Sequence, residues 1–284
     1  MKTLKYIFAI LIISASFLSC STDNDDEPTP MNPVAGLIKI YEFSEADHTV
    51  EIYSEKQVLE VGYNELSIRI LDKASNNYIS NAEPTWMPMM HMESMSHSGP
   101  HSMLRNTENE TVYKGHIVFQ MAENDTEYWE VALNYNFNGE PMSMAQRVSV
   151  VQPVDGFRKT QVFTGADEVR YIMAFVNPKD PQVAINDFQA VLYKMENMMT
   201  FPVVENYKVT VDPRMPSMGN HTSPNNEDMV YNAATKMYNG KLSFTMTGYW
   251  KINLKLLNAS GEVLKGEDIT DDNPASSLYF ELEF

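Results

Sequence analysis

Methionine and histidine gather in one stretch of the chain, residues 85–103, which reads TWMPMMHMESMSHSGPHSM. The stretch holds six methionines and three histidines in nineteen residues, and the one cysteine of the chain lies far away, at position 20. Thioether and imidazole together suit Cu(I), because the thioether is soft and stays neutral at any pH. Zinc prefers histidine, cysteine or carboxylate, and calcium prefers oxygen. The composition therefore predicts a Cu(I) site.

A shorter copy of this motif, RMPSMGNHTSP, follows at residues 214–224. Proline, glycine and serine interrupt both copies, which predicts exposed loops in which methionine has no packing role. The candidate ligands of the first loop are Met87, Met89, Met90, His91, Met92, Met95, His97 and His101. Those of the second loop are Met215, Met218 and His221. Aligning Met87, Met90 and His97 with these last three predicts a duplicated site.

Other methionines and histidines are predicted outside the metal site. A third cluster, KMENMMTFP, contains Met195, Met198 and Met199. Packing in a hairpin is favoured for this cluster over metal binding. Met103 lies at the end of the first loop and also fits a core position. His48 and His116 have no clustered partners, and both are predicted on the surface.

The flanks of the two motifs repeat as well, which indicates a duplicated domain. Each half has an alternating run, then the motif, then a Tyr-x-Gly strand, and finally a Tyr-Trp strand that contains Trp129 or Trp250. The hydrophobic period is close to two throughout, and no segment predicts a helix of ten or more residues. Both tryptophans are predicted to be buried in a core. The pattern predicts an all-β fold of two tandem immunoglobulin-like β-sandwiches.

The N-terminus has the features of an export signal. Lys2 and Lys5 precede an apolar stretch at 6–17, and the sequence FLSC resembles a bacterial lipobox that ends at Cys20. We expect Cys20 to be lipidated, the alternative being a buried structural cysteine. The predicted organisation is a signal peptide at 1–19, a disordered acidic tether at 20–36, a first sandwich at 37–151, a linker at 152–157 and a second sandwich at 158–284.

Acidic residues dominate the charge of the chain, with 38 Asp and Glu against 21 Lys and Arg and a net charge of −17. Loss of Lys2 and Lys5 with the signal makes the mature net charge −19. Such a surface repels nucleic acid and anionic lipid and attracts cations. We therefore expect a lipid anchor to be the one attachment to the membrane. The predicted location is the outer membrane, facing either the periplasm or, given the acidic run after Cys20, the cell surface.

The chain resembles the YtkA-like (FixH-like) domain family of exported bacterial proteins. The resemblance rests on the pattern M-P-x-M…H-[ST]-x-P, followed by Y-x-G, F-x-M and Y-W, and it covers both halves, most of residues 38–284. It implies an immunoglobulin-like fold and a role in copper handling or oxidase maturation.

We predict a lipid-anchored, non-catalytic protein that sequesters Cu(I) or delivers it to a copper-accepting or copper-exporting envelope protein. An alternative is a binding or assembly module whose methionine-rich loops contact a partner protein without metal. For the first loop, packing of its methionines against the partner sheet is a further alternative. An enzyme is disfavoured, because the sequence has no nucleophile elbow, glycine-rich phosphate loop or HExxH helix.

Overall fold

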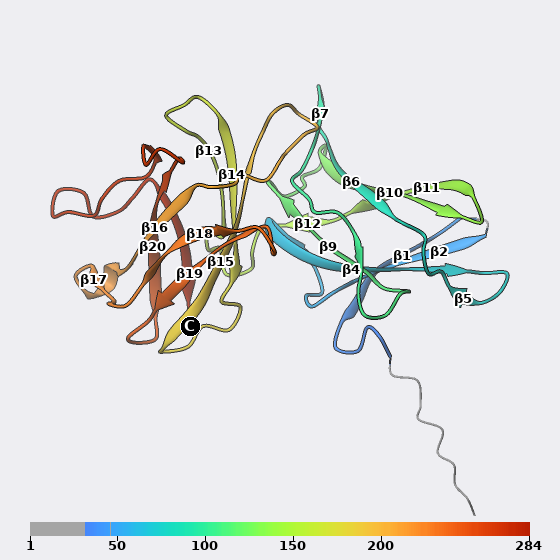
Figure 1. Cartoon of the computed structure of the whole chain (residues 1–284), viewed down its shortest axis with the longest axis horizontal. Coiled ribbons are helices and arrows are strands. Elements are labelled where there is room, and N and C mark those ends of the chain that lie inside the picture. The colour runs from blue at the N-terminus through green and yellow to red at the C-terminus, as the bar shows by residue number, and fades with distance from the viewer. Residues whose placement is uncertain (1–31, 46) are drawn as a thin grey trace, which may run out of the picture. The chain divides into compact units, whose positions relative to one another are not determined.

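The computed structural model describes residues 32–284 except residue 46, and strands dominate this part of the chain (Figure 1). The one helical element among these residues is a three-residue 3-10 turn, η1 (Pro216–Met218). The predicted signal peptide, Cys20 and residues 20–31 of the predicted tether lie outside the described residues. In the described part of the chain, no helix is long and apolar enough to cross a membrane.

The described part of the chain begins inside the segment that was predicted to be a tether. Residues 33–36 form a turn, and Val34 is buried in a small cluster with Tyr53 and Val112. Leu37 packs against the same cluster. These apolar contacts pack the last residues of the predicted tether against the first half of the chain.

The first half forms two antiparallel sheets that share one core. One sheet has the order β1 (Ile38–Ser44), β2 (His48–Ser54), β4 (Gly62–Asp72), β9 (Tyr113–Phe119) and β8 (Arg105–Asn106), with β5 (Asn77–Tyr78) paired to β4. The other has the order β11 (Glu140–Val148), β10 (Tyr128–Phe137), β6 (Thr85–His91) and β7 (Ser96–Ser98). The short strands β3 (Leu59–Glu60) and β12 (Val150–Val151) form a parallel pair. Ile68 and Ile117 of the first sheet pack with Trp129 and Leu133 of the second.

The second half forms one sheet that folds over its own core. Its order is β13 (Thr160–Thr164), β14 (Arg170–Asn177), β15 (Ile185–Lys194), β19 (Met237–Ser243), β18 (Glu227–Asn232), β16 (Lys208–Met215), β20 (Tyr249–Leu257) and β21 (Val263–Lys265). Two further strands join this path, β17 (His221–Thr222) beside β16 and β22 (Leu278–Glu283) beside β20. Phe175 of β14 and Phe280 of β22 meet across the core, with ring centroids 5.7 Å apart. The predicted all-β fold is confirmed, and each half of the chain encloses a hydrophobic core of its own.

An asparagine near the start of a central strand makes the same hydrogen bonds in both halves. Asn64 Nδ2 donates to the carbonyls of Glu60 and Gly62, both at 2.8 Å. Asn186 Nδ2 donates to the carbonyls at the same two spacings, those of Gln182 and Ala184, both at 2.9 Å. The Oδ1 atom of each accepts the N–H of the residue four positions earlier. Each side chain therefore satisfies the main chain of the turn that precedes its strand.

The two predicted core tryptophans also have matching environments. Trp129 and Trp250 are both fully buried. The indole N–H of Trp129 donates to the carbonyl of Met121 at 2.8 Å, and that of Trp250 donates to the carbonyl of Met246 at 3.1 Å. A buried indole needs such an acceptor, so each tryptophan fixes the chain segment that leads into its strand. These shared contacts support the predicted duplication.

Two histidines that were predicted on the surface are covered. His48 is buried at the start of β2, and its Nδ1 lies 2.8 Å from the Tyr135 hydroxyl. His116 Nε2 lies 2.7 Å from the hydroxyl of Tyr193, which belongs to the second sandwich. Burial lowers the pKa of His116 to about 4, with a smaller contribution from His101. Alternation predicts which face a residue occupies, and it does not predict whether another element covers that face.

The Asn64→Ala substitution should destabilise the protein by roughly 1–3 kcal/mol, because it leaves main-chain groups of a buried turn without partners. Asn186→Ala should cost less, since Asn186 is more exposed and water can replace its side chain. Urea unfolding followed by tryptophan fluorescence measures both changes. Asn134→Ala, at an exposed position of β10, is the control and should leave the midpoint unchanged. A larger loss at Asn186 than at Asn64 would contradict this account.

Candidate metal site

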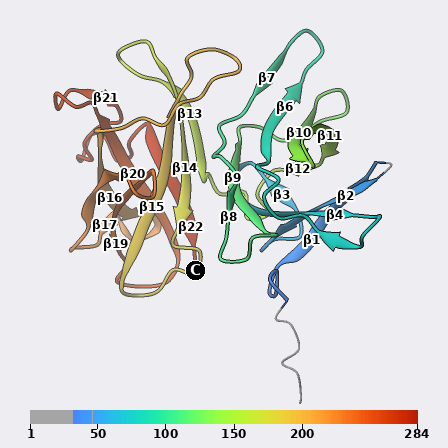
Figure 2. The same cartoon turned by 45° about the vertical axis from the view of Figure 1, so that its right-hand side comes forward.

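The methionine-rich stretch is a β-hairpin rather than the predicted loop. Residues 85–91 form β6, which pairs with β10 along its length and with β7 at its end (Figure 2). Both faces of β6 carry methionine, so the alternation that marks a strand is hidden in the sequence. Pro88 lies just beyond the last β6–β7 pair, at a position where the missing N–H costs little.

The inner face of β6 belongs to the core of the first sandwich. Trp86, Pro88 and Met90 alternate as buried residues, and Met90 has no exposed surface. His97 of β7 lies opposite Met90, and its ring meets that of Trp129 edge-on at 5.7 Å. The thioether of Met90 therefore packs in the core, which argues against its predicted role as a ligand.

The outer face of β6 brings three of the predicted ligands together. Met87, Met89 and His91 occupy alternate positions and are each half-buried. Their neighbours across β10 are Ala132, Glu130 and Tyr128, in that order. This face therefore presents two thioethers and one imidazole in a row, beside a carboxylate.

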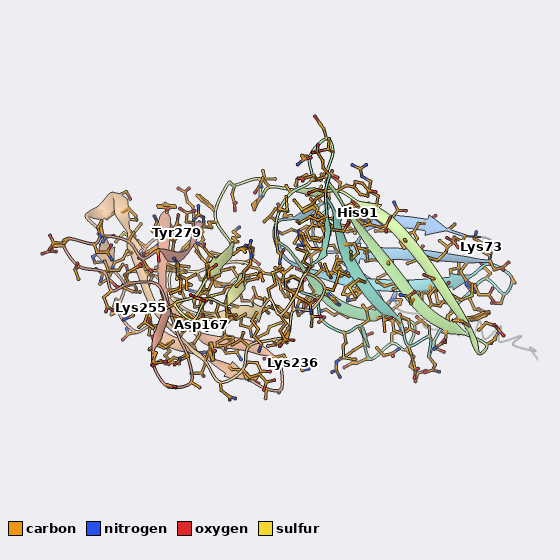
Figure 3. All side chains as sticks on the ribbon, turned by 90° about the horizontal axis from the view of Figure 1, so that it is seen from above. Lys73, His91, Asp167, Lys236, Lys255 and Tyr279 are labelled. Carbon is orange, nitrogen blue, oxygen red and sulfur yellow. The ribbon has the colours of Figure 1, made fainter. Side chains whose placement is uncertain are left out.

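His91, which is labelled in Figure 3, lies close to two residues of β10. Its ring stacks on that of Tyr128, with centroids 4.9 Å apart and planes 20° apart. Its Nε2 lies 3.6 Å from Glu130 Oε1, too far for a hydrogen bond, and this buried nitrogen has no hydrogen-bond partner. A buried polar atom without a partner is costly, unless a ligand satisfies it.

Met87 has a polar neighbour of its own. The hydroxyl of Ser98 in β7 donates to Met87 Sδ at 3.1 Å, and Ser98 has no exposed surface. This contact orients the sulfur on the outer face. Neither Ser98 nor the β10 residues stood out in the sequence, where the alternation of 128–133 was the one available signal.

The remaining predicted ligands of this stretch are not gathered at the outer face. Met92 packs against the first core, and its N–H donates to the carbonyl of Met95 at 2.9 Å, which closes the β6–β7 turn. Met95 and Met103 are exposed. His101 Nδ1 donates to the carbonyl of Gly99 at 2.8 Å, and burial lowers its pKa.

The residues of the second motif occupy other strand positions than the sequence alignment of the two motifs predicted. Met215 of β16 lies opposite His221 of β17, just as Met90 lies opposite His97. Met215 is buried in the second core, as Met90 is in the first. Met215 is therefore the equivalent of Met90, whereas the alignment had paired it with Met87.

The strands that contain Trp129 and Trp250 lead to the same equivalence of Met215 with Met90. They are β10, which pairs with β6, and β20, which pairs with β16. Pro88 lies opposite the residue two positions after Trp129, and Pro213 lies opposite the residue two positions after Trp250. The segment Pro-Met-Met of the first half thus matches Pro-Arg-Met of the second. The predicted alignment is displaced by three residues.

The outer face of β16 carries an ion pair where β6 carries thioethers. In this register Asp212 replaces Met87 and Arg214 replaces Met89. Arg214 donates from Nε and Nη2 to the two carboxylate oxygens of Asp212, at 2.7 and 2.9 Å. Met215 is buried while Met218 and His221 are exposed, so these three do not share one surface. Met215, Met218 and His221 therefore do not repeat the arrangement on the outer face of β6.

Other regions offer little for a soft metal ion. Among the described residues, no group of three or more His, Cys, Asp or Glu side chains is placed to hold a metal. A hollow of about 380 Å³, lined by both sandwiches, contains neither methionine nor histidine. Its lysines are paired, as in Lys179 with Glu55 at 2.5 Å. The outer face of β6 is therefore the strongest candidate in the described part of the chain.

No family model matches the chain, and no curated protein matches it. The adhesin FdeC of Escherichia coli resembles it with 11% identity and a TM-score of 0.25, over 82% of this chain and 63% of that chain. A DUF4785 family protein of Legionella pneumophila has 9% identity and a TM-score of 0.26, over 77% and 55%. The chain thus spans less than two thirds of the length of either structure. Neither comparison concerns the YtkA-like family, so that resemblance stays a prediction.

Substitutions at the buried methionines test their assignment to the cores. Met90→Ala and Met215→Ala should each destabilise the protein by about 2–5 kcal/mol, because each leaves a cavity. Met90→Leu and Met215→Leu should cost less than about 1.5 kcal/mol, since the volume is kept. Urea unfolding measures these changes, with the exposed Met218→Ala as control. An alanine variant as stable as the control would mean that its methionine does not fill a core.

Proposed function

We propose that this protein binds Cu(I) on the outer face of β6, through Met87, Met89 and His91, and holds or passes on the ion without catalysis. The observation that carries the proposal is the row of two thioethers and one imidazole on one strand face, in which the buried imidazole nitrogen of His91 has no hydrogen-bond partner. Copper is thus the ion that the protein stores or transfers, and it is not a catalytic cofactor in this proposal.

The spacing of the three residues suits one shared ion. Alternate residues on a strand face are about 6.7 Å apart, which the long side chain of methionine can span. Met89 lies at the centre of the row, with Met87 and His91 on either side. The stacking of His91 on Tyr128 restricts the orientation of the imidazole before an ion arrives. Such preorganisation lowers the entropy cost of binding.

The donor set favours Cu(I) over other ions. Two thioethers and one imidazole are soft or intermediate ligands and match a three-coordinate Cu(I) ion. Zinc prefers histidine, cysteine or carboxylate, and calcium prefers oxygen. No group of three or more His, Cys, Asp or Glu side chains among the described residues is placed to hold either ion. Glu130, opposite Met89, adds a negative charge that attracts a cation. Methionine also avoids the disulfide chemistry that threatens a cysteine site in an oxidising compartment.

The N-terminal features extend the proposal to the cell envelope. Export and lipidation at Cys20 would tether the protein to the outer membrane, facing the periplasm or the cell surface, and its acidic surface would raise the local cation concentration. The receiving partner would be a copper-accepting or copper-exporting envelope protein. The YtkA-like resemblance agrees with this role.

The test is a Cu(I) competition titration, without oxygen, of mature protein that lacks the lipid. The triple variant Met87→Leu, Met89→Leu, His91→Gln should lose its tightly bound Cu(I), since it loses every proposed donor while keeping apolar volume.

The second sandwich offers a matched control with the same residue types. The triple variant Met215→Leu, Met218→Leu, His221→Gln should bind Cu(I) as the unmodified protein does. Loss of binding in this control, with binding kept in the β6 variant, would refute the proposed site.

The methionine-rich contact surface remains the second candidate, because Met95 and Met103 are exposed on the same stretch. This function predicts no Cu(I) binding by the unmodified protein. The same titration therefore separates the two functions.

A further inference from the structure

We infer that the copper site is shared by the two sandwiches: the turn at residues 196–200 supplies the thioether of Met198 as a further ligand, so that Cu(I) strengthens the contact between the sandwiches. This inference rests on the proposed function. It concerns the methionine cluster for which the sequence favoured a packing role.

The turn after β15 meets β7 directly. The N–H of Ser98 donates to the carbonyl of Met198 at 2.8 Å. In Figure 1 the chain between β15 and β16 extends to the end of β7. The main chain of Met198 thereby lies against β7, 100 residues after Ser98 in the sequence.

Ser98 joins this turn to the outer face of β6. Its N–H bonds to the turn, and its hydroxyl donates to Met87 Sδ at 3.1 Å. It lies opposite Met89 in the β6–β7 pair, and its side chain is fully buried. One residue therefore links a proposed ligand of the first sandwich to a methionine of the second.

The turn is well fixed and presents its methionines to solvent. Asn197 Oδ1 accepts the N–H of Met199 at 2.8 Å, and the N–H of Glu196 donates to the carbonyl of Thr200 at 3.0 Å. Met198 and Met199 are nevertheless 44% and 43% exposed. A rigid turn that keeps two apolar side chains out of the core points to a role other than packing.

The strand that leads to the turn is anchored to the first sandwich. Val118 of β9 packs with Ile172 of β14 and Val191 of β15, and His116 Nε2 lies 2.7 Å from the hydroxyl of Tyr193. Tyr193 lies five residues before Met198, so this contact sets the position of the turn. A fourth ligand from a pre-positioned turn loses little conformational entropy on binding.

The test compares two variants of the full mature chain loaded with Cu(I). The double variant Met198→Leu, Met199→Leu should bind Cu(I) more weakly by roughly tenfold or more, the range typical for losing a supporting group at a metal site. X-ray absorption at the copper edge should show one sulfur ligand fewer than in the unmodified protein. Met218→Leu, another exposed methionine of the second sandwich, is the control and should change neither value.

Amide hydrogen exchange tests the coupling between the sandwiches. Cu(I) should slow exchange at Ser98 and in residues 196–200 of the unmodified protein, and this effect should disappear in the double variant. Unchanged affinity and an unchanged sulfur count in the double variant would overturn the inference and leave the β6 site standing. A protein that binds no Cu(I) at all would overturn both.

Discussion

Strand β6 carries methionine on both of its faces, and the alternation of a β-strand divides these residues between two roles. Trp86 and Met90 point into the core, where packing against Trp129 makes the strand an essential part of the first sandwich. Met87 and Met89 point the other way. The same contacts that bury the inner residues hold the outer ones in a fixed row, so the proposed site depends on the core beneath it.

The two sandwiches keep a common framework and differ at the surface of one strand. The core methionine, the proline two residues before it and the buried tryptophan opposite occur in both halves. On the outer face, Asp212 and Arg214 replace two thioethers with a bidentate ion pair. The strand thus tolerates very different outer residues, since only the inner positions determine packing. We interpret the second sandwich as a partner of the site, which contributes the turn at 196–200.

The fold could be predicted from the sequence, because period-two patterns and the repeated landmarks around Trp129 and Trp250 are local features. The structure of the methionine-rich stretch, residues 85–103, was harder to predict from the sequence. Its prolines, glycine and serines resemble a loop, and methionine at successive positions conceals which face is buried. The alignment of the halves followed Met-Pro-x-Met, whereas the strand register follows Pro-x-Met. The burial of His48 and His116 depends on residues about 80 positions away, Tyr135 and Tyr193, which no local pattern reveals.

The central claim is that a soft ion binds the outer face of β6. Methyl NMR of protein labelled with 13C at the methionine methyl groups reports each thioether separately, during titration with Cu(I) in the absence of oxygen. The methyl signals of Met87 and Met89 should shift as one ion binds, while those of the buried Met90 and Met215 should stay in place. Shifts confined to Met90 and Met215, or no shift in any methyl signal, would contradict the central claim.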